Sequence, residues 1–129
     1  MNIQSEQVTV QKSPQELFKF LTDVSNFELI LPDSLEQFKV YDDSFTFTLK
    51  GMPRINLAFV EKTPDHFIKL KATSDNLPVF LSCRILPEAE NKSQAQLFID
   101  ADINPMMAMM LKKPLQKLVD TLAYKMSEL

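Results

Sequence analysis

Two residues of this sequence, His66 and Cys83, carry side chains that can act as general bases or nucleophiles. His66 follows Thr-Pro-Asp, a segment typical of an exposed turn, whereas a catalytic histidine needs a nucleophile beside it in a closed site. Cys83 stands between Leu81 and Ile85 in a strand-like run, the position of a small buried hydrophobe rather than of a reactive thiolate. We expect neither residue to be catalytic, and one histidine with one cysteine excludes a zinc site built from the usual ligands.

Asp100 and Asp102 share one face of the last strand-like run, so as a pair they could bind a cation or perform acid–base chemistry. The opposite face of that run is wholly apolar and is expected to lie on the core. We therefore predict that both aspartates are solvated. Lys69 and Lys71 alternate with apolar residues in the same way and are also expected on a solvated face.

Arg84 is harder to place, because Phe80 and Leu86 share its strand face while Leu81 and Cys83 lie on the other. An arginine inside a binding site could orient the carboxylate of a ligand. Arg84 is therefore kept as a candidate ligand-binding residue. The sequence supports no catalytic residue set, no metal and no cofactor.

A single glycine, Gly51, occurs where an average chain of this length would have about nine. Neither the dinucleotide fingerprint nor the Walker loop can be written with one glycine, so nucleotide enzymes of those types are excluded. Gly51 itself lies between two strand-like runs, where a turn is the ordinary reason for glycine.

Composition also limits the partners and the compartment. The net charge is −3 and the lysines are dispersed, so we expect no nucleic-acid partner. The longest apolar run, residues 106–111, is far shorter than the roughly 20 residues of a membrane span, so we expect no transmembrane segment. One cysteine and no signal-peptide pattern indicate a cytoplasmic protein, and 129 residues are typical of a single domain, residues 1–129.

The amino-terminal part predicts one strand and two short helices. Residues 6–11 alternate and indicate a first strand. Ser13-Pro14-Gln15-Glu16 matches a capping box with proline at the first helical position. A second short helix is expected over residues 26–30, capped by Ser25 or Asn26 and ended before Pro32.

From residue 35 onward apolar residues recur with a period of two, which predicts an antiparallel meander. The alternating apolar positions are Phe38, Val40, Phe45, Phe47, Leu49, Ile55, Leu57, Phe59, Ile68, Leu70 and Ala72. A run over residues 79–86 follows, then a polar loop over 88–93. The last strand, residues 94–103, turns Ala95, Leu97, Ile99, Ala101 and Ile103 one way.

Residues 104–129 predict one long amphipathic helix, with Asn104 as its cap and Pro105 at its first position. Its apolar face consists of Leu111, Leu115, Leu118, Leu122, Met126 and Leu129. Met106, Met107, Met109 and Met110 open the helix and cannot all face one core. They either fill the end of the core, or form a portal, a partner surface or a homodimer contact.

The order of these elements resembles the START-like (SRPBCC) superfamily. The residues that carry the likeness are Ser13-Pro14-Gln15-Glu16-Leu17-Phe18 after the first strand, Leu21-Thr22-Asp23-Val24, Pro32 and the helix over 111–129. The resemblance implies the α+β helix-grip fold. In that fold a curved antiparallel sheet of about six to seven strands wraps around a long C-terminal helix, with two short helices after the first strand.

The superfamily includes lipid carriers, plant-hormone and pollen-allergen pockets, aromatic polyketide cyclases and coenzyme-Q-binding proteins. The resemblance implies a cavity between sheet and helix that holds an apolar or amphipathic ligand. It assigns no catalytic residues, because none are shared across the superfamily.

Three functions remain open. The first is binding of a hydrophobic or amphipathic small molecule without transforming it. The second is an enzyme similar to the polyketide cyclases, assisted by Arg84 or Tyr124, and the third is an interaction module whose cavity is filled by its own side chains. For the first, the expected cavity-lining residues are Phe45, Phe47, Leu57, Phe59, Leu70, Leu81, Arg84, Met106, Met110 and Leu118.

Overall fold

The computed structural model describes residues 1–49, 54–72 and 79–129. The turn predicted at Gly51 lies outside these ranges. The helical elements are α1 (Pro14–Leu21), η1 (Val24–Asn26), α2 (Phe27–Ile30) and α3 (Pro105–Ser127). The strands are β1 (Asn2–Gln4), β2 (Val8–Val10), β3 (Glu36–Val40), β4 (Ser44–Thr48), β5 (Ile55–Thr63), β6 (Phe67–Ala72), β7 (Val79–Ala89) and β8 (Lys92–Ala101).

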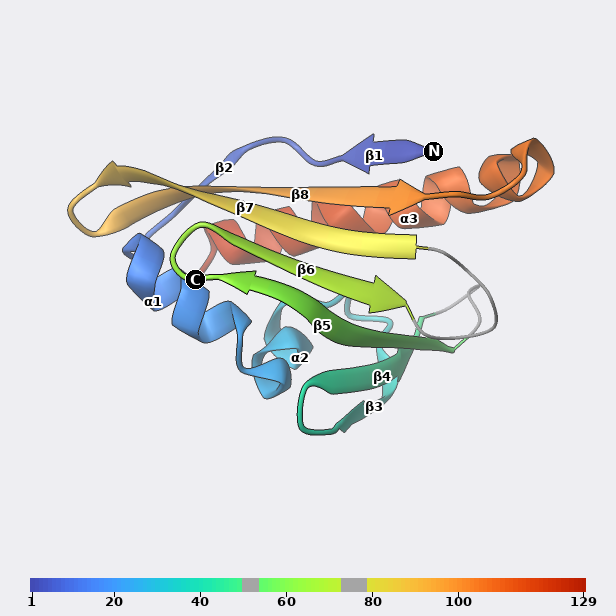
Figure 1. Ribbon diagram of the computed structural model, residues 1–129, viewed down its shortest axis with the longest axis horizontal. Coiled ribbons are helices and arrows are strands. Elements are labelled where there is room, and N and C mark those ends of the chain that lie inside the picture. Colours follow the sequence, from blue (N-terminus) through green and yellow to red (C-terminus); the bar gives the residue numbers. More distant parts are fainter. Residues whose placement is uncertain (50–53, 73–78) are drawn as a thin grey trace.

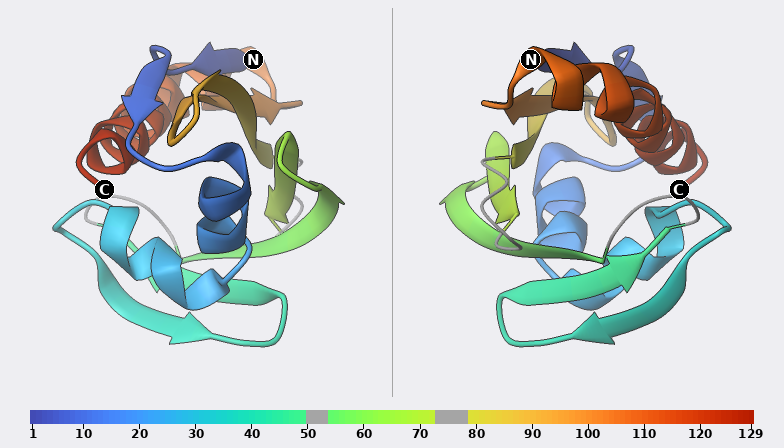
Figure 2. Two further views of the ribbon diagram at one scale, coloured as in Figure 1. Left: turned by 90° about the vertical axis from the view of Figure 1, so that its left-hand side faces the viewer. Right: turned by 90° about the vertical axis from the view of Figure 1, so that its right-hand side faces the viewer.

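Eight strands of the described ranges form one antiparallel sheet in the order β1-β8-β7-β6-β5-β4-β3, and β2 also pairs with β8. The sheet curves from β1 and β8 round to β3 and β4, with the helices on its concave side (Figure 1, Figure 2). The predicted α+β helix-grip fold is therefore confirmed.

The strand expected over residues 6–11 is found as β2, and a further short strand that was not predicted, β1, precedes it on the same edge of β8. Ser5 lies at the break. Its backbone N–H donates to the Leu97 carbonyl at 2.9 Å, and its hydroxyl oxygen accepts from the Leu97 N–H at 3.0 Å. The buried Ser5 thus keeps the β8 hydrogen bonds satisfied where the ladder is interrupted.

The predicted capping box of α1 is confirmed. The Ser13 hydroxyl accepts from the Glu16 N–H at 3.2 Å, and the Ser13 N–H donates to the Glu16 carboxylate at 3.3 Å. The N-cap residue of α2 is Asn26, one of the two predicted, although its side chain makes no capping hydrogen bond. The preceding turn η1 begins at Asp23, whose carboxylate accepts from the Ser25 N–H. The helical stretch ends before Pro32, as predicted.

The predicted meander is confirmed, with longer strands at its end. The polar loop expected over residues 88–93 is wrong, since β7 continues to Ala89, β8 begins at Lys92, and the two residues between them form the turn. Strand pairing gives the backbone N–H and C=O groups of these polar residues hydrogen-bond partners within the protein, which explains why they continue the sheet.

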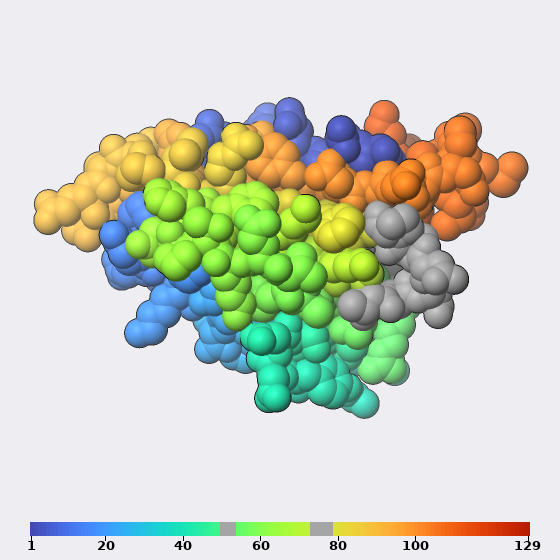
Figure 3. All heavy atoms as spheres, viewed as in Figure 1, coloured from blue at the N-terminus to red at the C-terminus, as the bar shows by residue number. Residues whose placement is uncertain are grey.

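Helix α3 lies on the concave face against β8, β1 and β2, and it also contacts α2. The Asn104 side chain accepts from the Met107 N–H at 2.8 Å, so the predicted cap is confirmed. The buried stripe contains Leu115, Leu118, Val119, Leu122, Ala123 and Met126. The first turns of α3 project past the end of β8 (Figure 1, Figure 3).

A polar contact ties α3 to the segment after α2. The Lys125 ammonium donates to the Leu31 carbonyl at 2.8 Å and forms an ion pair with Asp33 at 2.6 Å. It therefore fixes the last turns of α3 over the core, where Phe27, Ile30 and Leu31 are buried.

Candidate functional site

The concave side contains a tightly packed region, which we call the packed core and define by Phe45, Phe47, Ile85, Leu122 and Met126. Each of these side chains is 0% exposed. Phe45 stacks on Phe27 at a centroid distance of 4.6 Å and on Phe47 at 5.8 Å. A side chain with no exposed surface borders no space large enough for water, so the packed core offers no room for a ligand.

Exposure returns at the end where α3 begins. Six buried apolar side chains keep between 3% and 7% exposure there, and we call this set the open end: Leu49, Leu57, Ala72, Leu81, Leu115 and Leu118. Half-buried Ile55, Val79 and Leu111 adjoin it. The change runs along single elements, because on β7 exposure falls from Leu81 (3%) to Ile85 (0%). Burial of the core is therefore slightly less complete at this end.

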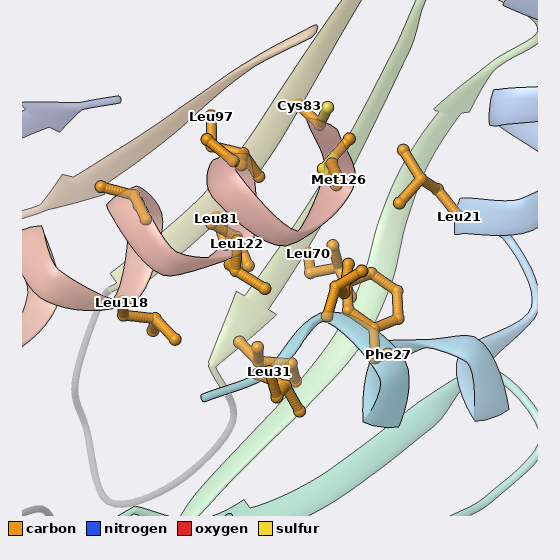
Figure 4. Close-up of a cluster of buried hydrophobic side chains, with 14 of the residues drawn as sticks. Leu21, Phe27, Leu31, Leu70, Leu81, Cys83, Leu97, Leu118, Leu122 and Met126 are labelled. Carbon is orange, nitrogen blue, oxygen red and sulfur yellow. The ribbon is translucent and has the colours of Figure 1, made fainter. Parts of the chain in front are cut away.

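The predicted lining residues divide between the two regions. Leu57, Leu81 and Leu118 belong to the open end, whereas Phe45 and Phe47 belong to the packed core. Leu70, at 1% exposure, lies beside Leu81 in the β6–β7 register. Figure 4 shows Leu70, Leu81 and Leu122 gathered between α3 and the strands, with Leu118 nearer the start of the helix.

Phe59, Met106 and Met110 complete the apolar part of the prediction. Phe59 is half-buried, and its ring centroid lies 6.3 Å from that of Phe27. The Lys62 ammonium lies 4.6 Å from the Phe59 ring centroid. Met106 and Met110 are exposed on the first turns of α3, beside the open end in sequence but outside the core. Of the two alternatives for the methionines, filling the end of the core does not hold for these two residues or for Met109, all of which are exposed.

Arg84 lies on the convex face of the sheet and does not point toward α3. Its neighbours Cys83 and Ile85 are buried, Arg84 is exposed, and its guanidinium lies 5.1 Å from the ring centroid of Phe98. The prediction that Arg84 binds a ligand inside the cavity is therefore wrong. The strand pattern was ambiguous because Phe80 and Phe98 also face outward, where cations cover their rings; Lys69 lies 4.6 Å from the Phe80 centroid.

The remaining candidate residues are exposed or chemically inactive. His66 is exposed in the turn between β5 and β6, and Asp100 and Asp102 are exposed, as predicted. Burial raises the pKa of the Cys83 thiol to about 12, which keeps it protonated at neutral pH. Across the described ranges, no group of three or more His, Cys, Asp or Glu side chains could hold a metal ion.

A hollow that the sequence did not predict lies outside the core between α3 and the β1–β2 edge. It has a volume of about 740 Å³ and a partly polar lining that includes Gln4, Gln96, Gln116, Asp120 and Tyr124. The Gln116 amide donates to the Gln4 carbonyl and to Asp120, both at 3.0 Å. These residues come from three separate elements, so no local pattern could have joined them.

No family model matches the chain, and no curated protein matches it by sequence. Solved structures do resemble it. Norcoclaurine synthase from Thalictrum flavum, in complex with dopamine and hydroxybenzaldehyde, has 11% identity and a TM-score of 0.73, covering 99% of this chain and 84% of that one. A START superfamily protein from Mycobacterium smegmatis has 12% identity and a TM-score of 0.71, covering 98% and 94%.

A conserved protein from Geobacillus kaustophilus is similar over 99% of this chain and 93% of its own length, with 13% identity and a TM-score of 0.71. At these identities the likeness is one of fold. The chain has the START-like helix-grip fold, as the sequence predicted. Among the described residues, no helix is long and apolar enough to cross a membrane.

Proposed function

We propose that this START-like domain is a cytoplasmic protein that binds a hydrophobic or amphipathic small molecule at the open end of its core, without transforming it. The observation that carries the proposal is the return of exposure along α3, β6 and β7 toward the start of α3. Water-accessible apolar surface inside a concave fold is the usual basis of a small-molecule site. The unpaired Cys83 supports a reducing compartment.

The chemistry of the open end favours apolar ligands. Its six side chains are aliphatic, so affinity should come from buried apolar area at roughly 25 cal/mol per Å² rather than from polar anchors. Fatty acids, isoprenoids and planar aromatics are better candidates than sugars or nucleotides. The norcoclaurine synthase structure, which holds two aromatic molecules, supports aromatics as one class that this fold accommodates.

Binding without catalysis is preferred to a cyclase-like reaction. A cyclase-like mechanism relied on Arg84 or Tyr124 inside the cavity, but Arg84 stacks on Phe98 at the convex face and Tyr124 is 64% exposed. Within the described ranges the only buried titratable side chain is Cys83, whose high pKa makes it a poor base or nucleophile at neutral pH.

The interaction module remains the competing function, because the packed core fills most of the concave side with its own side chains. Two substitutions on the same helix face distinguish the two functions. Leu115→Trp adds bulk at the open end, where the proposed ligand site would accommodate it, and Leu122→Trp adds it in the packed core, where overpacking costs about 1 to 3 kcal/mol. Leu122→Trp is thus the matched control for steric bulk.

The experiment combines thermal melts of both variants with titration of a fluorescent fatty acid into the wild type and Leu115→Trp. We expect saturable binding to the wild type, loss of that binding in Leu115→Trp, and a melting temperature for Leu115→Trp closer to the wild type than that of Leu122→Trp. Native mass spectrometry after extraction identifies any copurified ligand. No binding of fatty acid, isoprenoid or planar aromatic, with both variants equally destabilised, would favour the interaction module.

A further inference from the structure

The first turns of α3 present three exposed methionines, Met106, Met109 and Met110, which we call the Met tip. Their exposed fractions are 74%, 83% and 68%. Three large apolar side chains exposed within five residues form an apolar patch, and such a patch often marks a site that binds a partner or a membrane. The tip projects past the end of the sheet (Figure 1, Figure 3).

The Met tip continues into a basic stripe on the outer face of the same helix. Met106, Met110, Lys113 and Lys117 follow at spacings of four, three and four residues, which places them on one side of α3, and all four are exposed. The buried stripe of Leu115, Leu118 and Leu122 lies on the other side. An outward face with apolar residues followed by lysines is the pattern of a helix at a membrane surface.

Charge indicates which partner the face fits. Residues 104–119 contain Lys112, Lys113 and Lys117 and no acidic residue, in a chain whose net charge is −3. The local charge is thus opposite to that of the whole protein. An anionic lipid bilayer would attract this face and repel the rest of the surface, so it would orient the molecule with the Met tip toward the lipid.

We propose that the Met tip docks on an anionic membrane surface, with Met106, Met109 and Met110 entering the interface and Lys112, Lys113 and Lys117 facing the lipid phosphates. Flexible methionine side chains suit an irregular lipid surface. Docking stands independently of the proposed ligand. Leu111 and Leu115 follow the Met tip along α3, so in this orientation the open end lies close to the bilayer. The proposed ligand site and the proposed docking surface are then adjacent.

Vesicle cosedimentation of the whole protein tests this proposal. Vesicles of phosphatidylcholine with phosphatidylserine are compared with vesicles of phosphatidylcholine alone, at low and high salt. We expect binding to the anionic vesicles that weakens with salt. Met106→Gln/Met109→Gln/Met110→Gln should lower the partition coefficient at least about ten-fold. Lys112→Gln/Lys113→Gln/Lys117→Gln should lower it roughly a hundred-fold.

Matched controls remove the same number of apolar or basic groups elsewhere. They are the exposed set Leu29→Gln/Tyr41→Gln/Val60→Gln and the exposed set Lys19→Gln/Lys39→Gln/Lys92→Gln, which should bind like the wild type. Met109→Gln alone, at the most exposed position, serves if the triple variant folds poorly. The proposal would be overturned if the control sets lost as much binding as the test variants, or if both vesicle types were bound equally. It would also be overturned if the wild type bound no vesicles and were a dimer that the Met variant converts to a monomer.

Discussion

Leu115 and Leu122 lie about two turns apart on the same buried stripe of α3, yet their surroundings differ. Leu122 is 0% exposed in the packed core, whereas Leu115 is 5% exposed at the open end. One helix face therefore serves two purposes along its length. Its C-terminal part closes the core, and its N-terminal part borders the region where we propose that a ligand enters.

The difference follows from what covers each region. Near Leu122, α3 contacts α2, and the Lys125 contacts to Leu31 and Asp33 hold the helix down. Phe27 from α2 stacks on Phe45 and closes the aromatic part of the core. Toward its start α3 leaves the sheet, so its outward residues are exposed and its inward ones keep some exposure. Burial is thus most complete where α2 and α3 meet over the sheet, and the two regions adjoin, since Phe45 pairs with Leu57 in the β4–β5 register.

The largest expected effect compares Leu122→Ala with Leu115→Ala. Leu122→Ala leaves a void among close-packed neighbours and should lower the free energy of unfolding by about 3 to 5 kcal/mol. Leu115 is less completely buried, at 5% exposure, so Leu115→Ala should cost less, about 2 kcal/mol. Urea denaturation of both variants measures the difference. Equal losses would show that the open end is packed as tightly as the core.

The sequence predicted those parts of the fold that depend on local patterns. The capping box of Ser13 and Glu16 is satisfied within four residues, and the alternation along β8 and the stripe along α3 follow directly from helix and strand periods. Each of these patterns predicts a local structure correctly as long as its apolar side packs against the core. The α+β helix-grip arrangement, in contrast, was implied by the resemblance of the element order to the START-like superfamily.

What the sequence could not predict depends on contacts between distant residues. The break between β1 and β2 is stabilised by Ser5 bonding to Leu97, a partner 92 residues away. The side of the sheet on which Arg84 lies could not be predicted, because Phe98 is as apolar as a core residue. It faces outward, where the Arg84 guanidinium covers its ring. Likewise, no pattern tells which leucines of one stripe are tightly packed, since this depends on what covers them.

A second test compares thiol reactivity in the two regions. Burial raises the pKa of Cys83 to about 12, so this thiol should react with a disulfide reagent only after the protein opens. Introduced into a Cys83→Ala background, Leu115→Cys should be labelled faster than Cys83 in the wild type, by on the order of a hundred-fold. Labelling rates at pH 8 in native buffer give the comparison, and Leu122→Cys in the same background is the packed-core control. Similar rates at 115 and 122 would remove the distinction between the regions.

The smallest expected effect concerns the ion pair that holds α3 over the packed core. A hydrogen bond from Lys125, together with its charge, lowers the pKa of the Asp33 carboxyl. Because folding lowers this pKa, the pair stabilises the protein fully above the unfolded value of about 3.9, and the contribution is lost as the pH falls through the lower, folded value. Asp33 is exposed, so solvent screening keeps the contribution small.

Asp33→Asn should therefore lower the melting temperature by no more than a few degrees at neutral pH, and the difference from the wild type should vanish in strongly acidic buffer. Asp42→Asn, which removes another exposed carboxylate, in the β3–β4 turn, is the matched control. Fatty-acid binding should be unchanged in Asp33→Asn, because the pair lies over the packed core and away from the open end. If binding were weakened as much as by Leu115→Trp, the two regions would be coupled through α3, and the helix would respond to ligand as one unit rather than as two independent parts.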